Sequence, residues 1–426
     1  MPTKVRKFAH AFTASDGQLP ALEAKKPKVG SHSGTLPLAS GKSSKRFAPV
    51  RGGRQWTISI AVPGSMISNL ATAEQRLATV ARLARSLAIF CVDEVIVYDD
   101  DAPAAARGKS TLTRFPGADG APGVDSYTGD TDPCHFVAQV LSFLECPPFM
   151  RRRLFPLHPN LRHTALLPTL DMPHHPHAKA PWLPYVEGVT VPAADSSNEE
   201  ADGKSTSHSE GSWVDAGLGG LVHVEEAIPP NTRVTLRMDS PDAQQNPACA
   251  HPDAPRTEGG FYWGYAVRRS ANLSGVFTEC PYEGGYDLSV GTSERGMPLS
   301  QAMASHREAQ QQKHGHSRHG HDRGRYGNGG YGHDGGAAYN SSPRTPAAAP
   351  SFRHLLVVFG GPRGIELAAA HDPHLAELRI RGAKTQELFD HWVNVLPGQQ
   401  GSWAVDTDEA VPIALMGLRG LWEESV

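Results

Sequence analysis

The sequence predicts an α/β fold whose parallel sheet is interrupted by an inserted all-β segment. An apolar run at 57–62, a helical pattern at 72–90 and a second apolar run at 92–100 follow one another as strand, helix and strand. This order gives two parallel strands, because the helix carries the chain back along the sheet. In contrast, short β runs separated by turn residues fill 171–275. Their spacing is typical of a small five-stranded barrel.

The first helix has its own start signal and its own apolar face. Thr72 and Gln75 match a capping box, in which each side chain accepts a hydrogen bond from the other residue's backbone N–H. Apolar side chains then recur at helical spacing, which predicts one buried face as far as Phe90. These side chains are Leu77, Val80, Leu83, Ala84 and Leu87.

A second helix is predicted after 101–131, a stretch rich in Gly, Ala, Pro and Asp that indicates a surface insertion. Asp132 would cap this helix, and Pro133 would stand at its first position, where a missing N–H costs nothing. The predicted buried face consists of Phe136, Val137, Val140, Leu141 and Leu144.

The inserted β segment contains five apolar runs, and the α/β pattern returns after it. The five runs are 186–191, 213–218, 221–228, 233–238 and 261–270. Residues 351–361 then form an apolar strand that ends in Gly-Gly, and 386–402 indicate a helix, a short strand and a Gly/Pro loop. Thr407 is the predicted N-cap of a last helix that runs to about Leu418.

Composition excludes several classes of protein. No run of 18 apolar residues occurs, so no membrane-spanning helix is predicted, and the first residues lack an apolar stretch long enough for a secretory signal. The five cysteines form no CxxC pair, which argues against a disulfide framework or a zinc site and favours a reducing compartment. Only 39% of the 426 residues are hydrophobic, and 43 are Gly and 35 are Pro, so part of the chain belongs to no core.

Positive charge is concentrated at the start of the chain. Residues 1–54 carry eleven Lys or Arg and two acidic residues, although the whole chain has a net charge of −3. The clusters KKPK (25–28) and KSSKR (42–46) indicate an arm that binds nucleic acid, or a nuclear import signal. A solvated disordered tail and an organelle transit peptide stay open as alternatives.

Residues 297–350 are low in complexity and rich in Gly and His, and we predict that they are disordered. Five of their histidines could bind metal weakly, but the glycines between them fix no geometry, so no metal site is predicted. These are His314, His316, His319, His321 and His333.

Three polar loops that contain glycine are expected after apolar strands, at 291–296, 359–364 and 396–402. Ligands of parallel sheets bind where loops leave the carboxyl ends of the strands, and glycine lets backbone N–H groups approach a cofactor closely. One such loop could be a plain turn, and none is a GxGxxG or P-loop motif. Together they predict a small-molecule site. No GxSxG, HExxH or paired-carboxylate signature indicates a hydrolase.

Several long segments, taken in order along the chain, resemble one protein family. They include TISIAVPGSMISN, HTALLPTLDMPHH, GYDLSVGTSERG, HLLVVFGGPRGIE and NVLPGQQGSWAVDTDEA. They resemble the SPOUT-class RNA methyltransferases, in the group that contains a human centromere- and spindle-associated member and archaeal relatives. The resemblance covers roughly 56–100, 132–192, 212–296 and 352–420.

The resemblance implies a fold and an order of domains. Members have an α/β domain whose C-terminal part is threaded as a deep trefoil knot, and an OB-like β-barrel is inserted in that domain. The expected domains are a disordered basic tail at 1–54, the N-terminal part of the knot domain at 55–170 with the insertion 101–131, the barrel at 171–275, the C-terminal part with the cofactor site at 276–296 and 351–426, and the disordered insertion at 297–350.

The resemblance also implies a cofactor and a partner. Members bind S-adenosylmethionine in the knot loops and work as homodimers, with the catalytic pocket at the subunit interface. The LPGQQGS loop has one residue more than the commoner PGQGS form, so Gln399 and Gln400 are not distinguished. The implied cofactor contacts are Thr292, Arg295, Gly360, Gly361, Asn394, Gln399, Gln400, Gly401 and Thr407.

Two residues of the GTSERG segment are the candidates for catalysis. Methyl transfer depends mainly on holding a sulfonium methyl group in line with a nucleophilic base atom. Arg295 would orient the target base or neutralise a phosphate, and Glu294 would accept a proton from a ring nitrogen. The alternative is that Glu294 and Arg295 pair with each other.

Aromatic side chains near positive charge are expected to stack on single-stranded RNA from the barrel, although strand alternation buries one face. They are Phe261, Tyr262, Trp263 and Tyr265, with Arg268 and Arg269 nearby.

The expected function is S-adenosylmethionine-dependent methylation of a ribosomal RNA base, with a uridine ring nitrogen as one candidate acceptor. RNA and a second copy of the chain are the expected partners, without membrane association. The expected location is the nucleus or nucleolus, with the cytoplasm or an organelle as alternatives. A different class of function stays open, namely a non-catalytic RNA-binding or spindle- and centromere-associated scaffold that keeps the fold.

Overall fold

The structure is a computed structural model that consists of two compact units. It describes residues 47–101, 126–176, 182–192, 211–238, 247–316, 350 and 352–423. The small unit comprises Met1–Arg54, Cys146–Pro156 and Asp171–Trp263, and the large unit comprises Gln55–Glu145, Leu157–Leu170 and Gly264–Val426. In the part of the chain so described, no helix has both the length and the apolar character needed to cross a membrane.

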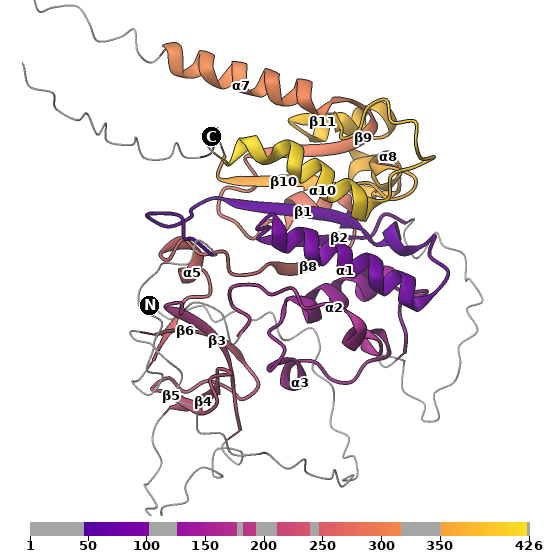
Figure 1. The fold of residues 1–426 in the computed structure, drawn as a ribbon. Helices are drawn as coiled ribbons and strands as arrows, with labels where there is room; N and C mark the ends of the chain where they lie inside the picture. Colours follow the sequence, from indigo (N-terminus) through magenta and orange to yellow (C-terminus); the bar gives the residue numbers. More distant parts are fainter. Residues whose placement is uncertain are drawn as a thin grey trace, which may run out of the picture. The chain divides into compact units, whose positions relative to one another are not determined.

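The large unit is built on a six-stranded parallel sheet with the strand order β11-β9-β10-β1-β2-β8 (Figure 1). The strands are β1 (Thr57–Pro63), β2 (Glu94–Tyr98), β8 (Ala266–Ser270), β9 (Leu288–Pro298), β10 (His354–Val358) and β11 (His391–Asn394). All residues of β1, β2 and β10 are buried, as in sheets that helices cover on both faces. The predicted α/β class and its parallel sheet are confirmed.

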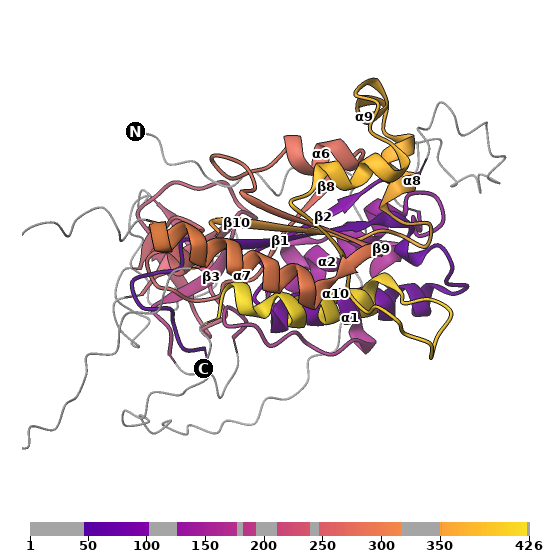
Figure 2. The same cartoon turned by 90° about the horizontal axis from the view of Figure 1, so that it is seen from above.

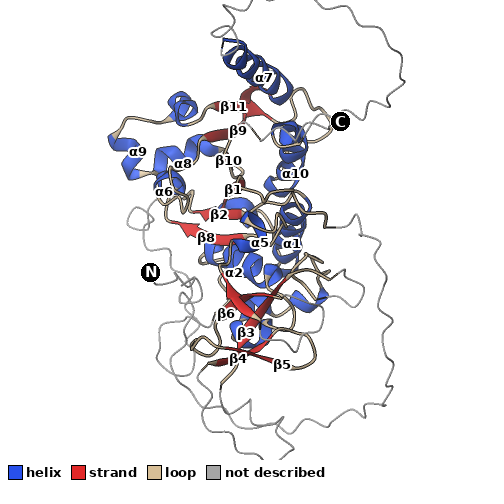
Figure 3. Cartoon of the chain, turned by 90° about the vertical axis from the view of Figure 1, so that its left-hand side faces the viewer, coloured by secondary structure: helices blue, strands red, loops and turns tan. Residues whose placement is uncertain are grey.

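Helices cover both faces of this sheet (Figures 2 and 3). One face carries α1 (Ala73–Ile89), α2 (Pro133–Glu145) and α10 (Thr407–Leu418), and the other carries α6 (Leu273–Thr278), α8 (Ile365–His371) and α9 (Pro373–Glu377). Short 3-10 turns complete the unit, at Gly64–Ile67, Pro159–Leu161, Thr164–Leu166, Gly382–Leu388 and Arg419–Leu421.

Two of the predicted helix starts are confirmed. The capping box of α1 forms between Thr72 and Gln75, with both reciprocal hydrogen bonds present. At α2, the Asp132 carboxylate accepts from the N–H of His135 at 2.9 Å, and Pro133 is the first helical residue. Local sequence therefore determines where these two helices begin.

The predicted start of the last helix is wrong by one residue. Asp406, not Thr407, is the N-cap of α10, because its carboxylate forms a capping box with Glu409. An ionised acceptor at this position satisfies helix N–H groups and also interacts favourably with the helix dipole. The Thr407 hydroxyl is thereby free for another contact, described below.

The small unit contains a five-stranded antiparallel sheet with the strand order β5-β4-β3-β6-β7. The elements of this unit are β3 (Tyr185–Thr190), β4 (Ser212–Asp215), β5 (Leu221–Val224), β6 (Arg233–Arg237), β7 (Ala248–Ala250), α3 (Arg151–Leu154) and α5 (Ala254–Thr257). Four of the five predicted β runs are strands here. Their inward side chains form an apolar core around Val214, Val224 and Leu236.

The fifth predicted run, 261–270, does not belong to this sheet. Its strand β8 pairs with β2 in the parallel sheet, and the small unit ends at Trp263. The fifth strand of the small unit is instead β7, a three-residue ACA segment that pairs with β6. Three small residues carry no β signal, whereas the strong apolar run downstream does, which explains the error.

Two segments that we predicted to be disordered are in part ordered. Residues 299–316 of the segment 297–350 form α7 (Leu299–His316), which contacts β9, β11 and α10 through a buried face that includes Leu299, Ala302 and Met303. In the basic tail, the N–H of Val50 donates to Gly260 O at 2.9 Å. Residues 1–46 of the tail and 317–349 of the insertion lie outside the described part of the chain, as do the side chains of the five candidate metal-binding histidines.

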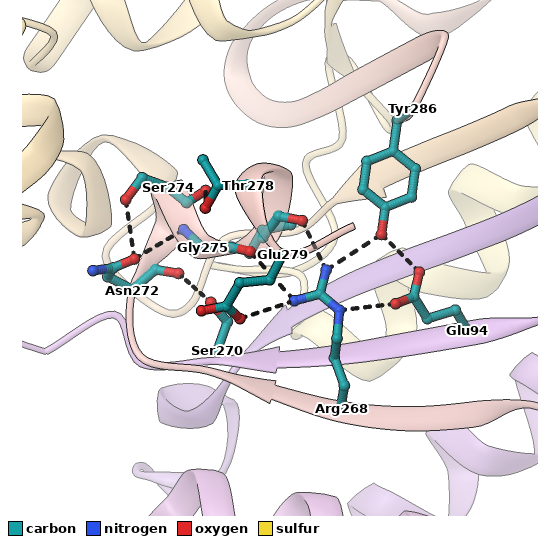
Figure 4. Close-up of polar contacts among 10 residues, drawn as sticks. Glu94, Arg268, Ser270, Asn272, Ser274, Gly275, Thr278, Glu279 and Tyr286 are labelled. Carbon is teal, nitrogen blue, oxygen red and sulfur yellow. Dashed lines mark hydrogen bonds and ion pairs between the residues drawn. The ribbon is translucent and has the colours of Figure 1, made fainter. Parts of the chain in front are cut away.

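A buried ion pair fastens the edge strand β8 to the rest of the large unit (Figure 4). Glu94 at the start of β2 is 2% exposed, and its carboxylate contacts Arg268 Nε at 2.9 Å. The hydroxyls of Tyr286 and Ser59 donate to the other carboxylate oxygen at 2.7 Å each. The Arg268 guanidinium also donates to Val276 O of α6 at 2.7 Å. Such saturation of donors and acceptors offsets the desolvation of a buried charge pair.

Removing one partner of this pair is expected to be costly. Arg268→Ala leaves the Glu94 carboxylate buried without its cation, which predicts a loss of about 3–5 kcal/mol in the free energy of unfolding. The matched control is Arg269→Ala on the same strand, because Arg269 and its partner Asp132 are both more than 40% exposed. The control should lose about 0–1 kcal/mol. Urea unfolding checks both values, and equal losses would contradict the assignment.

Candidate functional site

The candidate site lies at the carboxyl ends of β9, β10 and β11, where the three predicted glycine-bearing segments converge. In β9, Gly291 pairs with Trp392, and the next paired residue is Met297, which faces Val393. Residues 292–296 therefore leave the ladder between two consecutive positions of β11. We predicted this segment as a loop after a strand, and the structure corrects that to an excursion within one continuous strand. We call residues 292–296 the β9 excursion.

We call residues 358–361, at the carboxyl end of β10, the β10 exit. Hydroxyl groups from three separate elements donate hydrogen bonds to its backbone. Three consecutive carbonyl groups each accept one hydrogen bond from a side chain of β9, β2 or α10. These bonds run from Thr292 Oγ1 to Val358 O (3.1 Å), from the Tyr98 hydroxyl to Phe359 O (2.6 Å) and from Thr407 Oγ1 to Gly360 O (3.0 Å). Two of the three donors were predicted as cofactor contacts. Tyr98 was not, because inside an apolar strand it has the pattern of a core residue.

The two glycines after Phe359 are required by close approach of other groups. A Cβ atom on Gly360 would lie 2.7 Å from the backbone nitrogen of Ile365, and one on Gly361 would lie 2.1 Å from Ser65 Oγ. Both glycines are half-buried. Within the described ranges, no protein acceptor is found for their N–H groups. The β10 exit thus presents the N–H groups of Gly360 and Gly361 as donors, while the carbonyl oxygens of 358–360 already accept hydrogen bonds.

Asn394 joins the β9 excursion to the loop after β11. Its Nδ2 donates to Glu294 O at 2.9 Å, and its Oδ1 accepts from the N–H of Leu396 at 3.0 Å. Both ends of the amide are therefore engaged with backbone. In the structure, this predicted cofactor contact therefore joins two loops.

The two glutamines that the sequence left undistinguished have different surroundings. The Gln399 amide closes its own loop by donating to Ser402 O at 2.6 Å and accepting from the N–H groups of Gly401 and Ser402. Gln400 is exposed, as is Gly401. Gln399 therefore stabilises the loop, and Gln400 is the side chain available to a ligand.

The two candidate catalytic residues lie on the β9 excursion and are both exposed. Arg295 is 80% exposed, and its guanidinium lies 3.7 Å from Glu366 Oε1 at the start of α8. Ser293 Oγ donates to the same oxygen at 3.1 Å. In the described part of the chain, Arg295 thus pairs with Glu366 and not with Glu294, which corrects the alternative of a Glu294–Arg295 pair. Glu366 was missed, although it stands in the GGPRGIE segment.

A second buried carboxylate adjoins the β10 exit. Asp100 is 6% exposed and is the second residue after β2, in the group of three acids that follows this strand. It accepts from Ser65 Oγ at 2.5 Å and from the N–H of Ser65 at 3.2 Å, and a Cβ on Gly361 would lie 2.8 Å from it. Burial raises the pKa of Asp100 above that of an ordinary aspartate. The Ser65–Asp100 pair therefore connects the segments that follow β1 and β2, beside Gly361.

The aromatic and basic set expected to contact RNA is largely engaged in internal contacts. The Trp263 indole N–H donates to buried Glu187 at 2.7 Å, and Tyr265 is 3% exposed with its hydroxyl donating to Leu141 O at 3.1 Å. Arg268 belongs to the buried ion pair with Glu94. Packing and buried polar partners therefore rule out RNA stacking by Tyr265 and free RNA contact by Arg268. For Phe261, Tyr262 and Trp263, which are half-buried, and for exposed Arg269, RNA contact stays a prediction.

Comparison with known proteins identifies the family. Residues 57–418 match the family model described as "Putative RNA methyltransferase". A human protein named 28S rRNA (uridine-N(3))-methyltransferase is 33% identical over 374 residues, which cover 86% of this chain and 79% of the relative. The Drosophila melanogaster protein of the same name is 35% identical over 367 residues, 85% of this chain and 62% of the relative. A mouse protein of that name is 33% identical over 86% of this chain and 77% of its own length.

These matches confirm the resemblance found in the sequence segments. The matched range 57–418 contains the whole parallel sheet, the β9 excursion, the β10 exit and the loop after β11. The chain therefore belongs to this family of RNA methyltransferases.

Proposed function

We propose that the protein transfers a methyl group from S-adenosylmethionine to N3 of a uridine in large-subunit ribosomal RNA. The observation that carries the proposal is the 33–35% identity, over 85–86% of the chain, to relatives named for this reaction. The convergence of three loops at the carboxyl ends of parallel strands supports it, because this edge is where such sheets bind small molecules.

The chemistry of the β10 exit fits S-adenosylmethionine. This molecule offers adenine nitrogens and a carboxylate that accept hydrogen bonds, and the N–H groups of Gly360 and Gly361 are placed to donate. When bound, the cofactor supplies an electrophilic methyl group. Gln400 and Gly401 are exposed on the neighbouring loop and would complete the contacts. The residues that would hold the loops in place are Thr292, Asn394, Gln399 and Thr407.

Uridine N3 carries a proton that must leave before the nitrogen can be methylated, and negative charge then develops on O2 and O4. A guanidinium presents several donors in a planar fork and is suited to stabilise such charge. Arg295 is exposed, and its 3.7 Å contact with Glu366 is long enough to be exchanged for a base. We assign Arg295 this role and assign the exposed Glu294 carboxylate the role of accepting the N3 proton.

We further propose a knotted C-terminal part, an OB-like barrel and a homodimer. We propose a trefoil knot in the C-terminal part on the resemblance of its segments to the SPOUT class, and the strand order β11-β9-β10-β1 allows such a knot. An OB-like barrel is supported by the five-stranded antiparallel sheet of the small unit. A homodimer is supported by fully exposed Trp403 and by Met416 on α10, which a second copy would cover.

The basic segment at 1–54 supports both an RNA substrate and a nuclear or nucleolar location. Eleven Lys or Arg residues against two acidic ones give an arm that interacts with phosphate irrespective of sequence. Such an arm would raise the affinity for a long, structured RNA, while the site on the large unit selects the base.

Arg295→Ala is expected to lower methyl transfer to large-subunit rRNA by at least about a hundredfold, because a donor to the developing charge is lost. The measurement is transfer of a labelled methyl group, with thermal unfolding and sedimentation to check the fold and the dimer. Arg353→Ala is the control, since Arg353 is exposed at the opposite end of β10. Unchanged turnover in the Arg295 variant would remove the catalytic assignment, and no transfer by the wild type would favour the scaffold alternative.

Gly361→Ala is expected to weaken binding of S-adenosylhomocysteine at least about tenfold, because the new methyl group collides with Ser65 Oγ and with Asp100 at the β10 exit. Titration calorimetry measures the dissociation constant. Gly220→Ala in the small unit is the control, since a Cβ there meets nothing within 4 Å. Wild-type affinity in Gly361→Ala would show that the cofactor does not use this loop.

A further inference from the structure

The ladder between β1 and β10 ends because of one residue. The N–H of Phe359 donates to Ala61 O at 2.9 Å, so Ala61 is a residue of β1 whose backbone groups face β10. In a parallel ladder the next residue to face β10 stands two positions later, and its N–H would donate to the carbonyl of Phe359. That residue is Pro63, which has no N–H. The Phe359 carbonyl therefore lacks its ladder donor.

The Tyr98 hydroxyl supplies the missing donor. Tyr98 is the last residue of β2 and pairs with Pro63 on the far side of β1 from β10. Its hydroxyl reaches Phe359 O at 2.6 Å. Tyr98 is fully buried and Phe359 is 1% exposed, so water does not replace this bond. Burial also raises the pKa of Tyr98 well above its usual value, which keeps the hydroxyl protonated as a donor.

Because the Tyr98 hydroxyl takes the place of a backbone donor, Gly360 and Gly361 stay outside the ladder. A ladder continued past Pro63 would draw Gly360 and Gly361 into the sheet and use their N–H groups there. Instead, the three hydroxyls occupy the carbonyls of 358–360 and the chain turns away at Gly360. The carbonyl oxygens of 358–360 thus already accept hydrogen bonds, while the N–H groups of Gly360 and Gly361 stay available to a ligand.

We propose that Tyr98 is a positioning residue of the cofactor site, and that its hydroxyl acts together with those of Thr292 and Thr407 to aim the N–H groups of Gly360 and Gly361 at the bound ligand. The inference rests on the proposed function, because it takes the ligand of this loop to be S-adenosylmethionine. It adds a residue outside the three glycine-bearing segments, and it changes the role of Thr292 and Thr407 from ligand contact to support of the loop.

The test is the affinity for S-adenosylhomocysteine, measured by calorimetry on the full chain. Tyr98→Phe keeps the ring and removes only the donor, so the dissociation constant should rise about tenfold, the equivalent of one lost buried hydrogen bond. Thr407→Val should act in the same direction. Combined with Tyr98→Phe, it should cost less than the product of the two single effects, because both act on one loop. Hydrogen exchange at Phe359, whose N–H donates to Ala61 O in the unliganded protein, should accelerate in each variant.

Tyr286→Phe is the matched control for a general loss of stability. The Tyr286 hydroxyl donates to buried Glu94 at 2.7 Å, at the amino end of β2, whereas Tyr98 lies at its carboxyl end. The control should lose stability but change the dissociation constant by less than about twofold. Wild-type affinity in Tyr98→Phe, or an equal loss of affinity in Tyr286→Phe, would overturn the role of Tyr98 and leave the proposed function standing. Failure of the wild type to bind would overturn the proposed function as well.

Discussion

The site depends on one constraint, namely that the sheet offers no backbone donor to the Phe359 carbonyl at the end of β10. Pro63 on the neighbouring strand has no N–H, so the regular ladder stops one residue short of the glycines. Hydroxyls from β2, β9 and α10 satisfy the carbonyls instead, and each comes from a part of the chain distant in sequence. The geometry of the site therefore depends on the packing of β2, β9 and α10 around the end of β10.

The two ends of the parallel sheet differ in how completely their polar groups are paired within the protein. At the amino end of β2, the Glu94 carboxylate and the Arg268 guanidinium are saturated by each other, by hydroxyls and by helix carbonyls. At the carboxyl end, the N–H groups of Gly360 and Gly361 have no protein acceptor among the described residues, and the exposed guanidinium of Arg295 has a 3.7 Å contact with Glu366. A saturated network stabilises the fold, whereas binding and catalysis require groups that are held in place and can still exchange their contacts for a ligand.

Local signals made the positions of several elements predictable. The capping box at Thr72 and the Asp132–Pro133 start are readable because the residues that form them are near neighbours. The three glycine-bearing segments could be found because the carboxyl edge of a parallel sheet is a general ligand site. The distinction between Gln399 and Gln400 could not, since it depends on which amide folds back onto its own loop.

Features set by distant contacts could not be predicted from the sequence. The strand β8 has the same apolar signal whether it joins a barrel or the parallel sheet, and only its pairing with β2 decides. The helix α7 begins a segment whose later composition is low in complexity, and its order comes from packing on β9, β11 and α10. Tyr98 is indistinguishable from a core residue until its distance to Phe359 O is known.

We propose that the N–H groups of Gly360 and Gly361 serve the methylation of a ribosomal uridine. The most direct measurement is a map of modified nucleotides in large-subunit rRNA, obtained by mass spectrometry from cells with and without the gene. We expect one N3-methyluridine to disappear without the gene and to return when the wild-type chain is restored. An unchanged set of N3-methyluridines in cells that lack the gene would contradict it.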